Sequence, residues 1–258
     1  MKHSKIFWLV GIFLIIAIPI GFLSTRGTSK LEPECVSELE SKECDPKFVV
    51  VLHGLARSSA SMNKISQALQ GSGYTVCNVR YPSRKYPIEK LAVNFVYPEI
   101  KQCLGDIEQP LFVTHSMGGI IVRQLARSTP LKINRVVMLG PPNQGSELVD
   151  KLKVVPFFES INGRAGLSLG TESDSVPNTL GAVTFETGII AGNKSFNPIY
   201  SALIPGEDDG KVAVKSTQVE GMSDFIVVPH SHSFMMNADT VIEQTIAFLE
   251  HGRFSIDR

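Results

Sequence analysis

The sequence predicts an α/β domain with a mostly parallel central sheet flanked by helices. Two observations support this fold class. Short β-branched runs alternate along the chain with amphipathic stretches of helical length. The first of these runs, 48–52, is apolar throughout, as is typical of a strand buried on both faces. Hydrophobic residues make up 43% of the 258 residues, a composition that can build a packed core in one or two domains.

The expected elements can be placed in chain order. Strands are expected at 48–52, 74–79, 111–113, 135–139 and 225–228, and helices at about 61–70, 88–103, 118–127 and 238–249. Pro98 is expected to kink the second helix or to end it early. From 146 to 205 the alternation fades into a stretch rich in Gly, Ser, Thr and Asn, which we expect to leave the sheet as a cap-like insertion. The globular domain is placed at 48–252.

The N-terminal part of the chain has a different character. Residues 6–23 contain no charge, and this run is close to the ~20 residues that cross a bilayer and longer than the ~7–15 apolar residues of a signal peptide. We therefore expect an N-terminal membrane-spanning helix within residues 1–30, with a cleaved signal peptide as the alternative, and a polar linker at 31–47. Both interpretations export the rest of the chain, so the domain is expected to be membrane-anchored or exported and extracytoplasmic.

The positions of the cysteines and the net charge indicate the compartment in which the domain lies and exclude some classes of partner. All four cysteines follow the apolar segment, as expected in an oxidising compartment, and the pairs considered are Cys35 with Cys44 and Cys77 with Cys103, with free buried thiols as the alternative. The chain has no C-x-x-C pattern and no Cys/His cluster, so no metal site is expected. Because 25 basic residues balance 25 acidic ones, no nucleic-acid partner is expected.

The run Thr-His-Ser-Met-Gly at 114–118 lies between a predicted strand and a predicted helix. This is the context of a nucleophile elbow, in which a serine stands on a tight strand-to-helix turn with its Oγ exposed. Ser116 is therefore the candidate nucleophile. The backbone N–H of Met117 and the helix N-terminus would both favour the anion that forms during acyl transfer. Thr114 replaces the first glycine of the usual pattern, and its methyl group is expected to crowd the turn.

A serine nucleophile needs a general base and an acid that orients it. Among the six histidines, His230 and His232 remain as candidates, because both follow the last predicted strand, where the chain order Ser, acid, His would put the base. The acid is expected in the cluster at 207–209, ahead of a β-branched run at 211–214 that we expect to be a strand. Weaker candidates for the acid are Glu147 and Asp150.

These motifs resemble, in the same order, those of bacterial lipases and esterases of the α/β-hydrolase superfamily, over about residues 48–250. The matching blocks are 51–55 (Val-Leu-His-Gly-Leu), 115–119 (His-Ser-Met-Gly-Gly), 139–146 (Leu-Gly-Pro-Pro-Asn-Gln-Gly-Ser), 208–212 (Asp-Asp-Gly-Lys-Val) and 232–236 (His-Ser-Phe-Met-Met). The resemblance implies the α/β-hydrolase fold. It favours Asp209 as the acid and His232 as the base, and it implies that Leu55 N–H is the second oxyanion donor. Gly210 also favours Asp209, because its freedom in φ allows the turn that would aim the carboxylate inward.

The sequence thus predicts a serine hydrolase that cleaves carboxylic esters with an apolar acyl group. Ser116 would attack the carbonyl, His232 would carry the proton, and Asp209 would orient His232. The substrate would be a small-molecule or lipid ester, the N-terminal segment would bind the membrane, and no cofactor would be required. The alternatives are a thioesterase, amidase or acyltransferase with the same triad, or a non-catalytic binding protein with a hydrolase fold.

Overall fold

A computed structural model describes residues 47–105 and 107–255 of the chain. The expected membrane segment at 6–23 lies outside the described residues, as do Cys35, Cys44 and the linker up to residue 46. Within the described part, no helix combines the length and the apolar character needed to cross a membrane. The fold below is that of the described residues.

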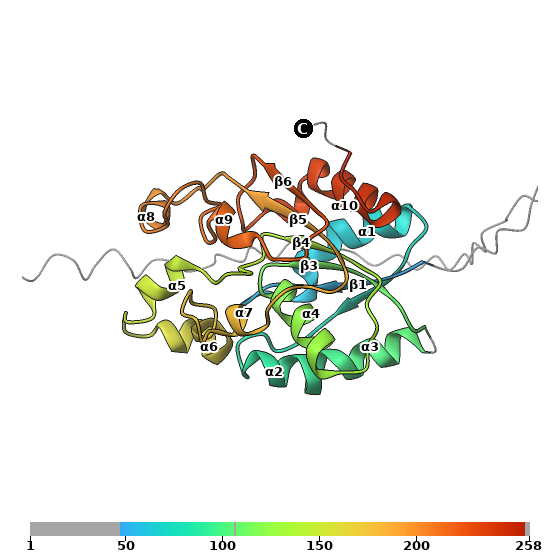
Figure 1. Ribbon diagram of the computed structural model, residues 1–258, viewed down its shortest axis with the longest axis horizontal. Helices are drawn as coiled ribbons and strands as arrows, with labels where there is room; N and C mark the ends of the chain where they lie inside the picture. The colour runs from blue at the N-terminus through green and yellow to red at the C-terminus, as the bar shows by residue number, and fades with distance from the viewer. Residues whose placement is uncertain (1–46, 106, 256–258) are drawn as a thin grey trace, which may run out of the picture. The chain divides into compact units, whose positions relative to one another are not determined.

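Six strands form one parallel sheet in the order β2-β1-β3-β4-β5-β6 (Figure 1). Their bounds are Phe48–Leu52 (β1), Thr75–Val79 (β2), Leu111–His115 (β3), Arg135–Leu139 (β4), Glu186–Gly192 (β5) and Asp224–Val228 (β6). The chain adds β2 on one side of β1 and then returns to place β3 on the other side. Open α/β sheets bind ligands at such a switch point, outside the carboxyl ends of the strands. The order of the strands therefore points to the loops after β1 and β3. The mostly parallel sheet is confirmed.

Helices cover both faces of the sheet (Figure 1). One face is covered by α1 (Asn63–Gly71) and α10 (Asp239–His251), and the other by α2 (Ile88–Leu91), α3 (Tyr97–Leu104) and α4 (Met117–Ser128). Short 3₁₀ turns occur at Ser59–Met62 and Met235–Asn237. Side chains of β1 alternate between the two apolar clusters: Val49 and Val51 pack in the cluster with α1 and α10, and Val50 and Leu52 in the other. The burial of this strand on both faces explains why 48–52 is apolar throughout.

Pro98 does not end the helical stretch in which it lies. A π-helical turn, Ala92–Val96, follows α2 and leads directly into α3, which has Pro98 in its first turn. A proline inside an α-helix leaves one backbone acceptor without its donor, whereas the first turn of a helix has no need of that N–H. Because the wider π-helical turn separates α2 from α3, Pro98 lies at the start of a helix and not in its middle. The helical path therefore continues to Leu104.

The stretch at 146–205 does not leave the sheet throughout, contrary to the expectation. It contains β5, which lies between β4 and β6. The apolar part of β5, Ile189 to Ala191, is short and has a glycine on either side, so its periodicity is too weak to predict a central strand. The rest of the stretch forms α5 (Glu147–Leu152), α6 (Phe158–Leu167), α7 (Val176–Thr179) and α8 (Pro198–Ser201).

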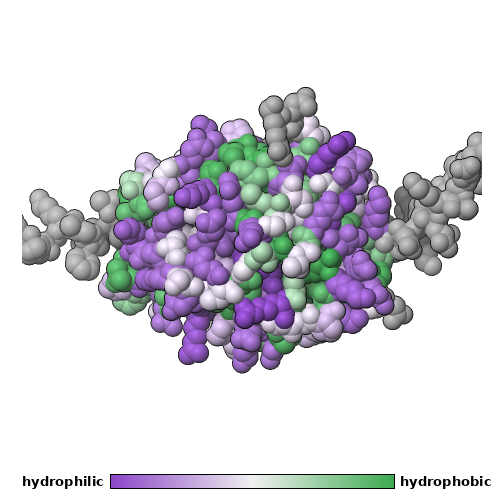
Figure 2. All heavy atoms as spheres, viewed as in Figure 1, coloured by the Kyte–Doolittle hydropathy of each residue, from purple (hydrophilic) through white to green (hydrophobic). Residues whose placement is uncertain are grey.

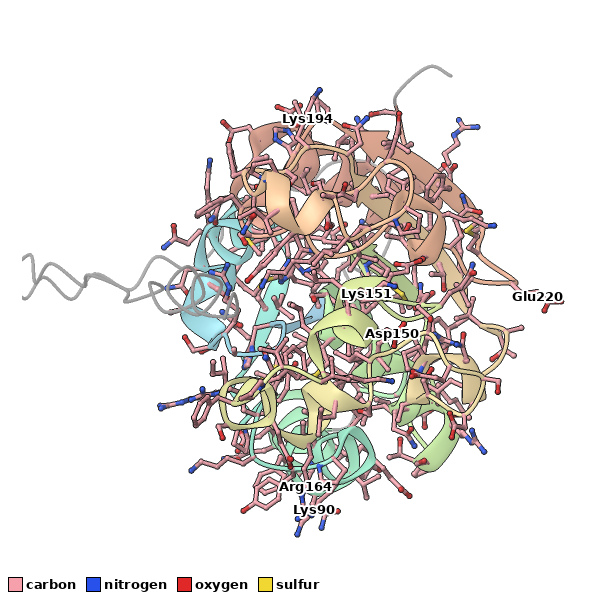
Figure 3. All side chains as sticks on the ribbon, turned by 90° about the vertical axis from the view of Figure 1, so that its left-hand side faces the viewer. Lys90, Asp150, Lys151, Arg164, Lys194 and Glu220 are labelled. Carbon is pink, nitrogen blue, oxygen red and sulfur yellow. A yellow bond between two sulfur atoms is a disulfide. The ribbon has the colours of Figure 1, made fainter. Side chains whose placement is uncertain are left out.

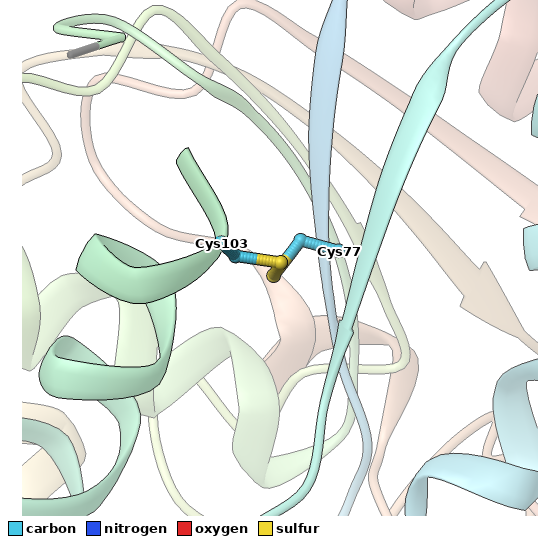
Figure 4. Close-up of a disulfide and its surroundings, with 2 residues drawn as sticks. All are labelled: Cys77 and Cys103. Atoms are coloured by element: carbon cyan, nitrogen blue, oxygen red, sulfur yellow. A yellow bond between two sulfur atoms is a disulfide. The ribbon is translucent and has the colours of Figure 1, made fainter. Parts of the chain in front are cut away.

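A disulfide joins Cys77 in β2 to Cys103 in α3 (Figure 4). Their Cα atoms are 6.1 Å apart, and the bond spans 26 residues of sequence. This is one of the two pairings considered from the sequence. A closed loop of that length stabilises a fold by about 3 kcal/mol when the cross-link restricts the unfolded chain. The bond fixes an edge strand of the sheet to the helical layer beside it.

Candidate active site

The turn between β3 and α4 consists of one residue. β3 ends at His115 and α4 begins at Met117, so Ser116 alone reverses the chain, with φ 55° and ψ −124°. A positive φ is uncommon for a residue that is not glycine, and such strain persists only where the surroundings hold it. The Ser116 N–H donates to the Leu139 carbonyl at 2.8 Å. A Cβ at Gly118 would lie 2.7 Å from the Leu52 carbonyl oxygen, so only glycine lets α4 start this close to β1.

Thr114 does not crowd this turn. It lies inside β3, in register with Leu52 and Met138, and is fully buried. Its Oγ1 is 3.5 Å from the Val137 carbonyl oxygen. The side chain is thus accommodated within the sheet, one residue before the strand ends, and the strained turn at Ser116 forms with threonine in place of glycine.

The structure brings Ser116, His232 and Asp209 together. The Oγ of Ser116 is 2.9 Å from Nε2 of His232, and Nδ1 of His232 is 2.7 Å from Oδ2 of Asp209. His232 and Asp209 are buried, whereas Ser116 is partly exposed. Ser116 follows β3, His232 follows β6 and Asp209 lies between β5 and β6. With a proton on Nδ1 held by the carboxylate, Nε2 is free to accept the serine proton.

The turn after Asp209 holds its second carboxylate oxygen. Oδ1 accepts hydrogen bonds from the N–H groups of Lys211 and Val212, at 3.0 and 2.8 Å, which leaves Oδ2 for His232. Gly210 has a φ of 93°, in the region that favours glycine. A buried carboxylate is costly unless its oxygens are hydrogen-bonded. These bonds satisfy the carboxylate and also fix its direction.

The β-branched run at 211–214 is not a strand, so this expectation was wrong. Ala213 makes only an isolated antiparallel bridge with Asp208, and Val214 begins the short helix α9 (Val214–Thr217). The apolar side chains of the run serve burial instead: Val212 and Ala213 are almost fully buried. The position of Asp209 is therefore set by a tight turn and not by the end of a sheet strand.

Gly140, directly after β4, gives Asp209 and His232 room to pack. A Cβ there would lie 3.0 Å from Oδ2 of Asp209 and 3.2 Å from Nδ1 of His232. Gly140 also has a positive φ of 54°. Nothing in the sequence block at 139–146 pointed to these contacts, which join Gly140 to residues about 70 and 90 positions away.

The other candidate acids and the other candidate base have partners of their own. His230 contacts Thr240 through Nε2, and Oδ1 of Asp208 accepts from Ser201 Oγ and Gly210 N–H. Glu147 and Asp150 accept hydrogen bonds from Ser216 and Thr171, respectively. Within the described parts of the chain, no cluster of three or more His, Cys, Asp or Glu side chains could hold a metal ion.

Two backbone N–H groups remain free beside Ser116. Leu55 lies in the loop after β1, and Met117 is the first residue of α4. Among the described residues, neither N–H donates a hydrogen bond. The first N–H groups of a helix have no acceptor within it. The loop after β1 reaches Ser116, because a Cβ at Gly54 would lie 3.0 Å from the serine Cβ.

His115 contacts the loop that carries His232, which no sequence motif indicated. Its Nε2 is 2.9 Å from the carbonyl oxygen of His232, and because a carbonyl only accepts, this nitrogen carries the proton. Burial holds the pKa of His115 well below the ordinary 6.5. His115 is therefore neutral and donates to the loop that carries the base. No local signal marks it, since its partner lies 117 residues away.

The fold and this site define a protein of the α/β-hydrolase fold. A family model described as alpha/beta hydrolase fold matches residues 47–158. This part of the chain contains β1 to β4 and the turn at Ser116. A search of curated proteins found no match to the chain.

Solved structures with this architecture include three enzymes. The mature lipase BlEst2 of Bacillus licheniformis matches with a TM-score of 0.63 and 20% identity, over 83% of this chain and 96% of the lipase. Phospholipase PlaB from Legionella pneumophila matches with a TM-score of 0.58 and 22% identity, over 79% of this chain and 56% of PlaB. The metagenomic carboxyl esterase MGS0156 matches with a TM-score of 0.57 and 19% identity, over 74% of this chain and 65% of the esterase. Likeness at this identity concerns the fold, and the predicted α/β-hydrolase fold is confirmed.

Proposed function

We propose that the protein is a serine hydrolase of carboxylic esters, with Ser116 as the nucleophile, His232 as the base and Asp209 as the residue that orients the base. The observation that carries this proposal is the continuous hydrogen-bonded chain of these three side chains, at the carboxyl ends of the parallel strands. Such a constellation is recognised by geometry and roles. The names of the structural relatives, which include a lipase, a phospholipase and an esterase, agree with this choice.

The proposed reaction has two stages, acylation of Ser116 and hydrolysis of the acyl-enzyme, and the same residues act in both. Ser116 Oγ bonds to the carbonyl carbon while its proton moves to His232 Nε2, and the N–H groups of Leu55 and Met117 stabilise the resulting oxyanion. The tetrahedral intermediate then releases the alcohol, which takes the proton from Nε2. Water repeats these steps on the acyl-enzyme and releases the acid. Asp209 keeps the proton of His232 on Nδ1 throughout and stabilises the imidazolium.

Exposed apolar side chains in the connections after β4, β5 and β6 support an apolar acyl group. We call six of them the apolar rim: Val154, Phe157, Ile161, Phe196, Ile199 and Phe234. Phe157 and Phe196 are 77% and 80% exposed, and Phe234, two residues after His232, meets Phe196 edge-on with ring centroids 6.1 Å apart. Clustered exposed apolar groups mark binding surfaces. The substrate is accordingly proposed to be a small-molecule or lipid ester.

Part of the rim belongs to a segment that packs on the loop after β1, which carries Leu55 and which we call the oxyanion loop. A Cβ at Gly166 of α6 would lie 3.1 Å from Cδ2 of Leu55. Figure 3 faces the side on which α5, α6 and α8 lie, with Lys151 and Lys194 at the surface. In Figure 2, hydrophobic residues appear at this same edge among hydrophilic ones. We propose that α5, α6 and the chain around α8 form the cap over the acyl group.

A labelling and turnover experiment tests the proposed function. A fluorophosphonate should modify the wild-type protein once, at Ser116, as located by peptide mass spectrometry. Hydrolysis of p-nitrophenyl esters should rise as the acyl chain lengthens from acetate to octanoate. A folded protein that neither reacts nor turns over would be a binding protein, and faster turnover of thioesters or amides than of matched esters would replace the proposed substrate class.

We also propose that the domain is extracytoplasmic, held at the membrane by the segment at 6–23. The Cys77–Cys103 disulfide supports an oxidising compartment, and the charge-free stretch supports insertion. The protein should stay with membranes after washing with carbonate. N-terminal sequencing of the mature protein distinguishes an intact anchor from a cleaved product that begins near residue 28. Recovery in the cytosol with free thiols at Cys77 and Cys103 would contradict both.

A further inference from the structure

The loop after β2 holds the loop after β1 by two side chains. The hydroxyl of Tyr81 donates to the carbonyl oxygen of His53, and the Tyr81 ring stacks on the His53 ring with centroids 4.1 Å apart and planes 13° apart. Ser83 Oγ accepts a hydrogen bond from the N–H of Ala56 at 3.1 Å. The two contacts thus lie on either side of Gly54 and Leu55.

The backbone at Ala56 needs such support. Its φ is 55°, and among the described residues only Ala56, Ser116 and Phe157 combine a positive φ with a side chain. Two of these three adjoin a proposed oxyanion donor, since Ala56 follows Leu55 and Ser116 precedes Met117. A strained backbone persists where its surroundings over-determine it. At Ser116 the strand and helix on either side do so, whereas Ala56 lies in a loop and Ser83 holds its N–H.

Both hydroxyl groups are buried although they lie in a surface connection. Tyr81 and Ser83 are each 4% exposed, whereas Arg84 and Lys85, which follow, are exposed. Burial of a hydroxyl is unfavourable unless it is hydrogen-bonded, and these two find partners in the loop after β1. Burial also raises the pKa of Tyr81, so its hydroxyl remains a donor.

We propose that Tyr81 and Ser83 are positioning residues that aim the N–H of Leu55 at the substrate oxyanion. This inference rests on the proposed serine-hydrolase function. Ser83 occupies the N–H of Ala56 and Tyr81 fixes the carbonyl of His53, so the peptide groups between them are held at both ends. An oxyanion donor accelerates the reaction only when it already points to where the negative charge develops.

Conservative variants with matched controls test the proposal. Tyr81→Phe removes one hydroxyl and keeps the stacked ring, and Ser83→Ala removes one acceptor. Tyr74→Phe is the control for the first, because Tyr74 is also 4% exposed and its buried hydroxyl has no hydrogen-bond partner among the described residues. Ser66→Ala is the control for the second, because Ser66 is 6% exposed and its Oγ likewise lacks a partner within the described chain.

Turnover per active site separates positioning from stability. A fluorophosphonate titration gives the concentration of reactive Ser116, and kcat and KM for p-nitrophenyl butyrate are then expressed per titrated site. Loss of a whole oxyanion donor costs about 10²–10³ in kcat, so a donor that is aimed poorly should cost about 5- to 50-fold. We expect that loss in Tyr81→Phe and in Ser83→Ala, with KM within about twofold and the pH profile unchanged, because the base is not touched. The loss in kcat of the double variant should not exceed about 10³-fold, since both residues act through one donor.

Each possible outcome decides between explanations. Per-site kcat within about twofold of wild type in both variants, or equal losses in the two controls, would overturn the positioning roles of Tyr81 and Ser83 while the serine-hydrolase function stands. A wild-type protein that fails to react with the probe and to turn over the ester would overturn the proposed function and this inference together.

Discussion

The proposed reaction centre and the apolar rim both lie in connections that follow strands of the same sheet, but they are built differently. In the centre, His232 and Asp209 are buried and every contact in the chain Ser116–His232–Asp209 is a hydrogen bond of 2.7–2.9 Å. In the rim, Phe157 and Phe196 are mostly exposed and lie in loops just before α6 and α8. A carbonyl group must be met within fractions of an ångström, whereas acyl chains need only an apolar surface. The centre should therefore respond to single atoms, and the rim to bulk hydrophobicity.

The largest loss of activity is expected from Ser116→Ala. Removal of the nucleophile in such triads costs on the order of 10⁶ in turnover, because no other group can form the acyl-enzyme. Alanine tolerates the positive φ about as well as serine, so the fold should persist. Ester hydrolysis and probe labelling measure the loss, and circular dichroism measures the fold. More than a few per cent of wild-type activity in a folded variant would refute the role of Ser116.

Next in size are the partners of the serine. Asp209→Asn keeps an oxygen for the N–H groups of Lys211 and Val212 but presents an amide N–H to Nδ1 of His232 and so favours the wrong tautomer. We expect Asp209→Asn and His232→Ala each to lower kcat at least about 10³-fold. Steady-state kinetics of the purified variants provide the measurement.

Neighbours of these residues serve as matched controls. His230→Ala and Asp208→Asn should each cost less than about tenfold, because His230 contacts Thr240 and Asp208 holds Ser201 and Gly210. A reversed order within either pair would move the role to the neighbouring residue and leave Ser116 as the nucleophile.

The buried histidine beside the centre predicts a dependence of stability on pH. The folded protein keeps His115 neutral, whereas the unfolded chain binds a proton below about pH 6.5, so its contribution is complete above that pH and is lost as the pH falls. Between pH 7.5 and 5.5, one such histidine lowers the free energy of unfolding by about 1.4 kcal/mol. Urea titrations at both pH values should show that His115→Gln is less acid-sensitive than wild type by about this amount. Equal sensitivity would mean that His115 is protonated in the fold.

The smallest effects are expected at the rim. Phe157→Ser and Phe196→Ser should each lower kcat/KM for p-nitrophenyl octanoate about three- to tenfold relative to the acetate, since each removes part of an apolar contact. Melting temperatures should stay within a few degrees, because both rings are mostly exposed. Val227→Ser, at an exposed apolar residue of β6, is the control and should leave the ester profile unchanged. Altered stability with an unaltered profile would assign the rim a structural role.

The sequence by itself determined what local patterns encode. The apolar run of β1 predicted a strand buried on both faces, and the run at 114–118 predicted a tight turn with Ser116 between a strand and a helix. Periodicity also placed α4 and α10 to within a few residues. Each of these signals depends on neighbours in the chain, so the residues alone were enough.

Only the tertiary structure decided which distant groups meet. β5 was missed because its apolar core is short. The run at 211–214 was wrongly expected to be a strand, because Val212 and Ala213 are buried outside the sheet and Val214 begins α9. Sequence spacing left His230 and His232 equivalent, and the family resemblance was needed to favour one. Contacts of Gly140 with the acid, of His115 with the base loop and of Tyr81 with the oxyanion loop have no local pattern at all. They arise because parallel strands bring their carboxyl ends to one edge, whatever the separation in sequence.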